Sequence, residues 1–288
     1  MAYNNSKVVI IGAGPAGIAC AIQLARYNIN TVIIEKNKIG GLSINANLIE
    51  NYLGFPKGIS GEKYVQLIIN HVKNLKIDIK YETAEIVDYV DGFFKIKTNK
   101  NNHQSEIIVI ASGTKPIVPK VPSISGYVAD KVFFEIQKIR DVKNKTIAII
   151  GAGDCAYDYA LSLCINNKVI ILNRSKKIKA LPILHKRALQ SRNISYYENT
   201  TVIEISEKQD NLVCASIPKK KIFTVNYLLI AIGREPEYSF INSKLFNIDK
   251  LYRIGDVNNE HYRQISIASG DGTITAMKIN NILNGRLH

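Results

Sequence analysis

The 288-residue sequence lacks a paired-cysteine motif and any cluster of metal ligands. Its four cysteines are Cys20, Cys155, Cys164 and Cys214, and no two of them form a C-x-x-C pair. Cys155 and Cys164 are nine positions apart on one expected helix, which places them on opposite faces and excludes a local disulfide. The five histidines are scattered, and no Cys/His group has the spacing of metal ligands. We therefore expect no metal site.

Long hydrophobic runs are missing as well. The longest, such as 107–111 and 228–232, have the length of a β-strand and are far too short to span a membrane. The first expected strand, 7–11, begins too close to residue 1 to leave room for a signal peptide. We expect a cytoplasmic protein with no membrane partner.

Acidic residues are fewer than basic ones, 24 against 38, which gives a formal net charge of +14. Such a surface attracts anionic partners. However, the sequence has no basic stripe with interleaved aromatics, no zinc-finger spacing and no RNP-like segment, so nucleic acid is a poor candidate. An acidic protein partner fits the charge better.

Two glycine-rich turns of the same design are present, G-A-G-P-A-G at 12–17 and G-A-G-D-C-A at 151–156. Each follows a short β-branched strand, 7–11 or 146–150, and precedes an expected helix, 18–25 or 156–163. In such a turn the first glycine makes the bend, the second lets the backbone approach a pyrophosphate, and the third lets helix and strand pack closely. The pair predicts two dinucleotide sites, as in a flavin enzyme.

The strands that follow the two turns differ in charge. Strand 31–34 ends at Glu35, whose carboxylate can accept hydrogen bonds from a ribose 2′-hydroxyl, as in FAD or NAD. Strand 169–172 ends instead at Asn173 and the segment 174–179, which holds four cations and no acid. These cations suit a 2′-phosphate and predict NADPH at the second site. An ordinary solvated lysine loop remains the alternative.

Two interpretations of Cys155 remain open. At a helix N-terminus its thiol pKa could be depressed, which would make it reactive. A small residue that simply packs in the turn is the more common case.

Further short motifs accompany the turns. They are G-G-L at 40–42, I-E-N-Y-L-G-F-P at 49–56, I-A-S-G at 110–113, A-I-G-R-E-P at 231–236, G-D at 255–256, R-Q-I at 263–265 and A-S-G-D-G at 268–272. With the two turns, they make nearly the whole chain resemble the low-molecular-weight thioredoxin reductase family of flavoproteins.

The resemblance, with the turns and Glu35, implies which residues bind each cofactor. For FAD they are Gly12, Gly14, Pro15, Ala16, Gly17, Glu35, Lys36, Gly41, Leu42, Asn51, Ala111, Ser112, Gly113, Gly255, Asp256, Gln264 and Ile265. For NADP they are Gly151, Gly153, Asp154, Cys155, Ala156, Asn173, Arg174, Ser175, Lys179, Gly233 and Arg234. Asp256 would bond the ribityl chain, and the helix that opens near Gln264 would stabilise negative charge on the pyrimidine side of the flavin.

The resemblance also implies an α/β fold of two Rossmann-like domains, each with three layers around a parallel sheet that has a small antiparallel layer. The FAD domain would comprise 1–114 and 241–288, interrupted by an NADP domain at 115–240. The expected linkers, 114–116 and 235–237, contain proline and charge after a buried strand. The antiparallel layer of the FAD half would lie in 81–98, with Asp91-Gly92 as its turn. A homodimer is expected from the family.

One departure from the family bears on function. Members that reduce thioredoxin carry a C-x-x-C pair in the window that here reads F-E-I-Q at 134–137. A dithiol is the relay that passes electrons to a protein disulfide, so we do not expect thioredoxin reduction by the usual route. The stretch V-F-F at 132–134 leading to Lys145, and G-D-C-A-Y-D-Y-A at 153–160, resemble instead the ferredoxin-NADP reductases built on this scaffold, which lack the dithiol, and this resemblance implies ferredoxin as partner. Hydride transfer on a bound flavin needs no acid or base, so we expect no catalytic side chain. Alternatives are a disulfide reductase that uses a non-standard thiol, an NAD(P)H oxidase or diaphorase, and a non-enzymatic flavoprotein that binds FAD as a redox-sensing or binding module.

Overall fold

The computed structural model describes residues 3–119, 130–218 and 220–285. Contacts divide the chain into two compact units, residues 1–44, 49–115 and 235–288 in the first, and residues 45–48 and 116–234 in the second. One unit is therefore inserted in the other. The chain returns to the first unit between Arg234 and Glu235, earlier than the expected boundary at residue 241.

The first unit is built on a mixed seven-stranded sheet with the order β3-β2-β1-β6-β5-β4, and β17 pairs with β6 as well. Strands β3, β2, β1, β6 and β17 are parallel, whereas β5 pairs antiparallel with β6 on one side and with β4 on the other. The strands are β1 (Asn4–Ile11), β2 (Thr31–Glu35), β3 (Asp78–Tyr81), β4 (Ala84–Val90), β5 (Phe93–Thr98), β6 (Asn102–Ile110) and β17 (Leu251–Arg253).

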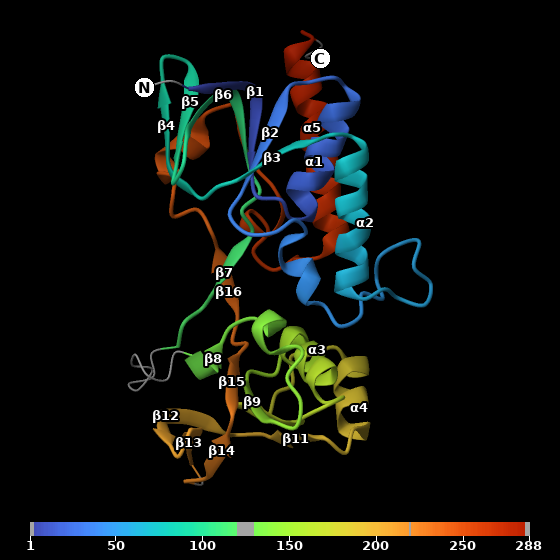
Figure 1. The fold of residues 1–288 in the computed structure, drawn as a ribbon, viewed down its shortest axis with the longest axis vertical. Helices are drawn as coiled ribbons and strands as arrows, with labels where there is room; N and C mark the ends of the chain where they lie inside the picture. The colour runs from blue at the N-terminus through green and yellow to red at the C-terminus, as the bar shows by residue number, and fades with distance from the viewer. Residues whose placement is uncertain (1–2, 120–129, 219, 286–288) are drawn as a thin grey trace. The chain divides into compact units, whose positions relative to one another are not determined.

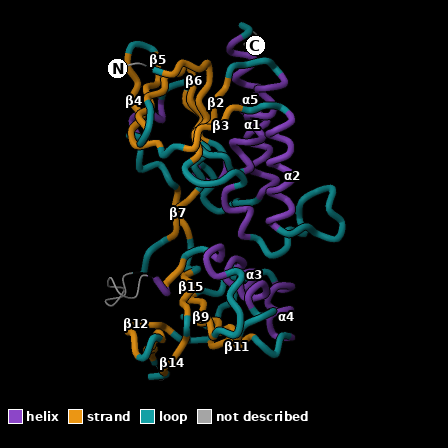
Figure 2. Tube along the Cα trace, viewed as in Figure 1, coloured by secondary structure: helices purple, strands orange, loops and turns teal. Residues whose placement is uncertain are grey.

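Three helices, α1 (Pro15–Arg26), α2 (Gly61–Asn74) and α5 (Ile265–Leu283), lie side by side on one face of this sheet (Figures 1 and 2). Successive residues of a buried strand point to opposite faces. Val8 and Ile10 of β1 accordingly pack in the core with α1 and α5, while Val9 and Ile11 pack in a second core with the antiparallel strands. The three expected layers are thus the helices, the parallel strands and the antiparallel hairpin β4–β5, which continues the same sheet beyond β6.

Short 3₁₀ helices complete the first unit. They are η1 (Gly41–Asn45), η4 (Ser243–Asn247) and η5 (Gly255–Val257). The turn between β4 and β5 is the expected Asp91-Gly92, and both residues have positive φ, 55° and 83°.

The second unit has a five-stranded parallel sheet with the order β11-β10-β9-β15-β8. Its elements are β8 (Val132–Phe133), β9 (Thr146–Ile150), β10 (Lys168–Leu172), β11 (Ile194–Tyr197), β15 (Tyr227–Ile230), η3 (Ile136–Ile139), α3 (Asp154–Leu163) and α4 (Pro182–Gln190). A three-stranded antiparallel sheet of β12 (Thr201–Lys208), β13 (Asn211–Ile217) and β14 (Ile222–Val225) shares a core with the parallel sheet. The resemblance implies a small antiparallel layer in each domain, but no residues were predicted for this one.

The two connecting segments, β7 (Thr114–Pro116) and β16 (Arg234–Pro236), pair with each other as a two-stranded sheet. On one side of the crossing the Ile117 amide donates to the Gly233 carbonyl at 3.1 Å, and on the other the Glu237 amide donates to Gly113 at 3.0 Å. Within the described ranges, no helix has both the length and the apolar character that a membrane crossing requires.

Candidate dinucleotide sites

The first glycine turn follows β1 and leaves no room for side chains at two positions. A Cβ on Gly12 would lie 2.3 Å from the Ala111 carbonyl oxygen at the end of β6, and Gly12 has φ +108°. A Cβ on Gly17 would lie 2.0 Å from the Gly12 carbonyl oxygen. These glycines let α1 and β6 approach the turn at backbone distance.

Gly14 differs, because a Cβ there would meet no protein atom within 4 Å. It is the N-cap of α1 in extended backbone, with Pro15 as the first helical residue and Ala16 buried behind it. Gly41 packs beside this point, since its Cβ would lie 3.2 Å from Gly14 Cα. The N-terminus of α1 therefore opens onto space where an anion can approach the backbone.

Glu35 ends β2 beside this turn, and both oxygens of its buried carboxylate accept backbone donors. The Ala13 amide donates to Oε2 and the Asn37 amide to Oε1, each at 2.7 Å. Since an ionised carboxylate has about four acceptor positions, Glu35 orders the glycine turn and keeps capacity for ribose hydroxyls. Lys36, the next residue, is exposed.

The late motifs of the chain reach the same edge of the sheet. β17 pairs with β6 at Arg253 and Ile110, so the 3₁₀ turn with Gly255 and Asp256 follows beside the segment that holds Ala111, Ser112 and Gly113. Because β2, β1, β6 and β17 are neighbours in one parallel sheet, the residues after them gather at its carboxyl edge, where α/β folds bind ligands.

A long-range contact joins two further motifs. Asn51 Nδ2 donates to Gln264 Oε1 at 2.8 Å, although 213 positions separate them. Gln264 is the N-cap of α5 and Ile265 its first residue. Leu42 lies in η1.

The second glycine turn repeats the arrangement at the carboxyl edge of the other sheet. A Cβ on Gly151, which has φ +125°, would lie 2.2 Å from the Ala231 carbonyl oxygen, whereas a Cβ on Gly153 would meet nothing within 4 Å. Asp154 starts α3 and accepts a hydrogen bond from the Leu181 amide at 2.7 Å, which fixes the segment before α4. Ala156 is buried.

Asn173 organises the loop after β10. Its buried amide nitrogen donates to Tyr196 Oη at 2.9 Å and to the Lys177 carbonyl at 3.1 Å, and its oxygen accepts from the Ser175 amide at 3.3 Å. Arg174 and Lys179 are exposed on this ordered loop.

Residues 6–272 match the family described as pyridine nucleotide-disulphide oxidoreductase. The chain belongs to this family.

Similar proteins within the family share nearly the full length. The chain is 29% identical over 306 residues to a thioredoxin reductase of Bacillus subtilis, covering 95% of this chain and 93% of the relative. Two solved structures are each 26% identical and cover 97% of this chain and 99% of theirs: the thioredoxin reductases of Lactococcus lactis, with a TM-score of 0.88, and of T. acidophilum, with 0.86.

A pyridine nucleotide-disulphide oxidoreductase of the thioredoxin reductase type uses FAD and NADPH. The residues at and after the two glycine turns fit both FAD and NADPH. Gly14 and Gly153 open onto space at a helix N-terminus, as a pyrophosphate requires. Glu35 retains acceptors for a free ribose, and the exposed cations of the 174–179 loop suit a 2′-phosphate.

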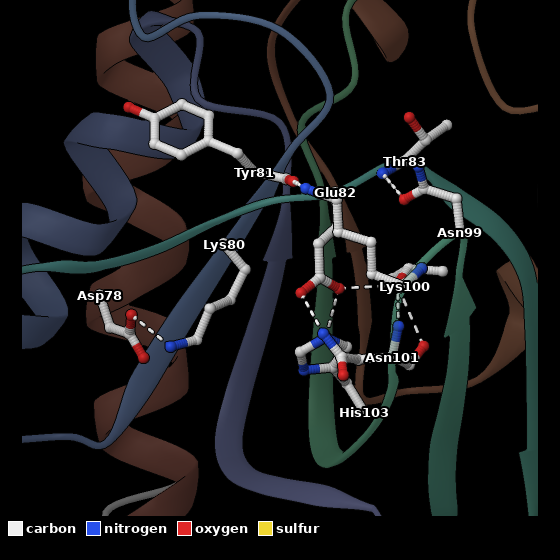
Figure 3. Close-up of polar contacts among 10 residues, drawn as sticks. Asp78, Lys80, Tyr81, Glu82, Thr83, Asn99, Lys100, Asn101 and His103 are labelled. Atoms are coloured by element: carbon white, nitrogen blue, oxygen red, sulfur yellow. Dashed lines mark hydrogen bonds and ion pairs between the residues drawn. The ribbon is translucent and has the colours of Figure 1, made fainter.

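A buried polar cluster around Glu82 was not predicted from the sequence (Figure 3). It is joined to Glu35 through the backbone. The Glu82 amide donates to the Glu35 carbonyl at 3.0 Å. The Glu82 carboxylate accepts from Thr98 Oγ1 at 2.6 Å, Asn101 Nδ2 at 2.7 Å and His103 Nε2 at 2.9 Å. Burial alone would raise the pKa of Glu82, but these hydrogen bonds and the attraction of His103 hold it below its ordinary value.

Asp271 was also missed as a site residue. Its Oδ2 accepts from the Gly255 amide at 3.0 Å and from Asn259 Nδ2 at 2.7 Å. The available signal was its place inside the A-S-G-D-G motif, but only the fold shows that this carboxylate reaches the turn at Gly255.

Arg234, expected at the NADP site, forms an ion pair with Glu135 at 3.3 Å. Glu135 lies in the window 134–137, where the resemblance predicts a dithiol in thioredoxin-reducing members, and it precedes η3 as its N-cap. Gly233, beside Arg234, has φ +129°. In this window, therefore, the Glu135 carboxylate is paired with Arg234.

The cysteines are free thiols, and the possibility of a depressed pKa at Cys155 is wrong. The Cys155 residue is exposed at the surface, yet the atoms packed around its thiol desolvate it and raise its pKa to about 11, helped by the charge of Asp158 and opposed by a hydrogen bond with Tyr159. Burial likewise raises the pKa of Cys20 to about 12 and that of Cys214 to about 11. Within the described residues, no group of three or more His, Cys, Asp and Glu side chains could hold a metal ion.

Proposed function

We propose that the chain oxidises NADPH and passes the electrons singly to an acidic iron-sulfur protein of the ferredoxin type. The observation that carries the proposal is the window 134–137, which reads F-E-I-Q where a dithiol relay would stand. The excess of basic residues supports an acidic partner.

When bound, FAD accepts hydride from NADPH and releases electrons one at a time. The chain's own residues bind and orient. Glu35 holds the first glycine turn open, and Asp154 fixes the second turn against the segment before α4. The N-terminus of α5 at Gln264 supplies a positive dipole end, which favours added negative charge nearby. None of these roles requires a catalytic acid or base.

A second candidate, a disulfide reductase, is favoured by the relatives, which are named thioredoxin reductases. The cysteines of this chain offer no relay for that reaction. Cys155 and Cys164 stand at opposite ends of α3, about 13 Å apart by helical rise, too far for a disulfide. The raised pKa of Cys155 also disfavours the thiolate that would attack a disulfide.

The decisive experiment is stopped-flow spectroscopy of the purified flavoprotein. The flavin is first reduced with NADPH, and its reoxidation is then followed with ferredoxin, with oxidised thioredoxin and with oxygen. We expect fast reoxidation by ferredoxin and none by thioredoxin. The Cys155→Ser variant keeps a side chain of similar size in the expected NADP turn. Once its flavin is reduced, it should transfer electrons to ferredoxin as the parent protein does, because the proposed reaction uses no thiol.

Three outcomes would contradict the proposal. Reoxidation by thioredoxin would establish the disulfide reductase, and loss of electron transfer in Cys155→Ser with full flavin content would establish a thiol mechanism. Reoxidation by oxygen or quinones alone would establish an oxidase or diaphorase. We also propose a homodimer, from the family resemblance, which light scattering of the purified protein tests.

A further inference from the structure

The turn η5, which carries the proposed flavin residue Asp256, cannot cap itself. Its N-cap is Ile254, whose side chain has no acceptor, so the Gly255 amide at the start of the turn needs a partner from elsewhere. Asp271 of α5 supplies it, because its Oδ2 accepts from that amide at 3.0 Å. The positive end of the turn also stabilises a carboxylate at this position.

Asn259 closes the same turn from its other end. Its amide nitrogen donates to Asp271 Oδ2 at 2.7 Å and contacts the Gly255 carbonyl oxygen at 3.2 Å. The backbone amides of Asn258 and Asn259 donate to the same carbonyl, at 2.9 and 3.0 Å. One oxygen of Asp271 therefore holds both ends of the segment that contains Asp256.

The η5 turn and the start of α5 pack closely against α1. A Cβ on Gly255 would lie 2.8 Å from the Ala16 Cβ of α1, and a Cβ on Gly272 would lie 2.2 Å from the Ala16 carbonyl oxygen. The turn and α5 both rest on the first residues of α1, which follow the glycine turn. Asp271, adjacent to Gly272, is thus fixed relative to the pyrophosphate end of the proposed FAD site.

We propose that Asp271 is a positioning residue for FAD, which acts by fixing the turn that presents Asp256. The inference rests on the proposed assignment of Asp256 to the FAD site. This proposal gives a role to the Asp271 carboxylate, which links α5, the η5 turn and Asn259. Asp271 does not itself contact the flavin in this proposal.

The test measures the Kd for FAD by titrating apoprotein, together with the apoprotein melting temperature. Asp271→Ala should raise the Kd at least about ten-fold, as loss of hydrogen bonds to a charged group predicts. Asp271→Asn keeps an acceptor oxygen and should stay within about three-fold of the parent. The melting temperature of apo Asp271→Ala should match that of Asp88→Ala, which removes an exposed carboxylate from β4.

A double variant separates positioning from general stability. If Asp271 acts through Asp256, adding Asp271→Ala to Asp256→Ala should change the Kd by less than about two-fold. Full additivity of the two effects overturns the proposal. Should Asp271→Ala not fold, Asn259→Ala replaces it, with an expected rise in Kd of about three-fold or more for the loss of one hydrogen bond.

The single variants distinguish two kinds of failure. If Asp256→Ala leaves the Kd unchanged, the proposed FAD site is wrong and the inference falls with it. If Asp256→Ala weakens FAD binding but neither Asp271→Ala nor Asn259→Ala does, the site stands and the positioning role is refuted.

Discussion

Glu82 shows how a single buried charge is stabilised in the first unit. It is 6% exposed, and three side-chain donors surround its carboxylate (Figure 3). Its partner His103 is 1% exposed. A buried carboxylate that loses a donor must bear the cost of desolvation without compensation. Because the Glu82 amide also bonds to the Glu35 carbonyl, this cluster supports the end of β2.

His103→Ala should therefore destabilise the protein by about 2–4 kcal/mol, since it leaves Glu82 buried with one donor fewer. Denaturant unfolding at neutral pH measures the change. The matched control is Lys97→Ala, which removes an exposed partner of Glu85 at 4.0 Å and should cost less than about 1 kcal/mol. If the two variants lost equal free energy of unfolding, the buried Glu82–His103 pair would contribute no more to stability than an exposed ion pair.

The cations after β10 are expected to select the coenzyme. The Arg174→Ala, Lys179→Ala double variant should lose about 1–3 kcal/mol of the preference for NADPH over NADH, through loss of charge-assisted contacts to the 2′-phosphate. The ratio of kcat/KM for the two coenzymes reports this directly. An unchanged ratio would mean that the segment is an ordinary solvated loop.

The two glycine turns invite a matched test at the level of the element. Gly14 and Gly153 both have negative φ, −73° and −93°, and at both an added Cβ meets only open space. Alanine should therefore fold at either position yet obstruct a pyrophosphate. We expect Gly14→Ala to lose FAD, and Gly153→Ala to retain FAD while its KM for NADPH rises. Flavin absorbance and steady-state kinetics separate the two results.

The reverse of that pattern, or no effect from either substitution, would contradict the assignment of the two turns. Circular dichroism of both variants checks that the fold is intact.

The elements around the turns could be predicted because their signals are local. Strand β9 has the predicted bounds, whereas α1 and α3 begin earlier than predicted, at Pro15 and Asp154, because Gly14 and Gly153 serve as their N-caps. The position of the sheet β12–β14 was not predicted, because its first turn uses Gln209 and Asp210 at positive φ, without a glycine. Such a turn leaves no clear mark in the sequence.

Contacts between residues far apart in the sequence could be predicted only in part. The resemblance assigned both Asn51 and Gln264 to the flavin, but their direct hydrogen bond appears only in the fold. The pairing of Glu82 with His103 depends on how β6 aligns with its neighbours, and the link from Asp271 to Gly255 depends on the packing of α5. Neither has a spacing that a sequence pattern could reveal. The pKa of Cys155 also depends on its tertiary surroundings.

Across the whole molecule, the positive charge is unequally divided. Residues 45–48 and 116–234 carry 19 basic and 9 acidic residues, a formal charge of +10, whereas the rest of the chain carries 19 and 15, or +4. Charge of one sign speeds encounter with an oppositely charged protein, and salt screens the effect.

Electron transfer to ferredoxin should therefore slow steeply as ionic strength rises, because the Debye length falls to about 8 Å at physiological salt. Hydride transfer inside the NADPH complex should change much less. Both rates can be followed by stopped flow from low to high salt. Equal sensitivity of the two steps would count against an acidic protein partner.

The pairing of β7 with β16 brings the two ends of each unit together. The ends of the inserted unit meet at Ile117 and Gly233, and the ends of the interrupted unit meet at Gly113 and Glu237. Because neighbouring ends make chain closure cheap in entropy, the gene segment for 117–233 is a natural cassette. Recombination that exchanges this cassette would leave the ends of the first unit paired, so we expect the proposed coenzyme preference to be separable from the proposed flavin site.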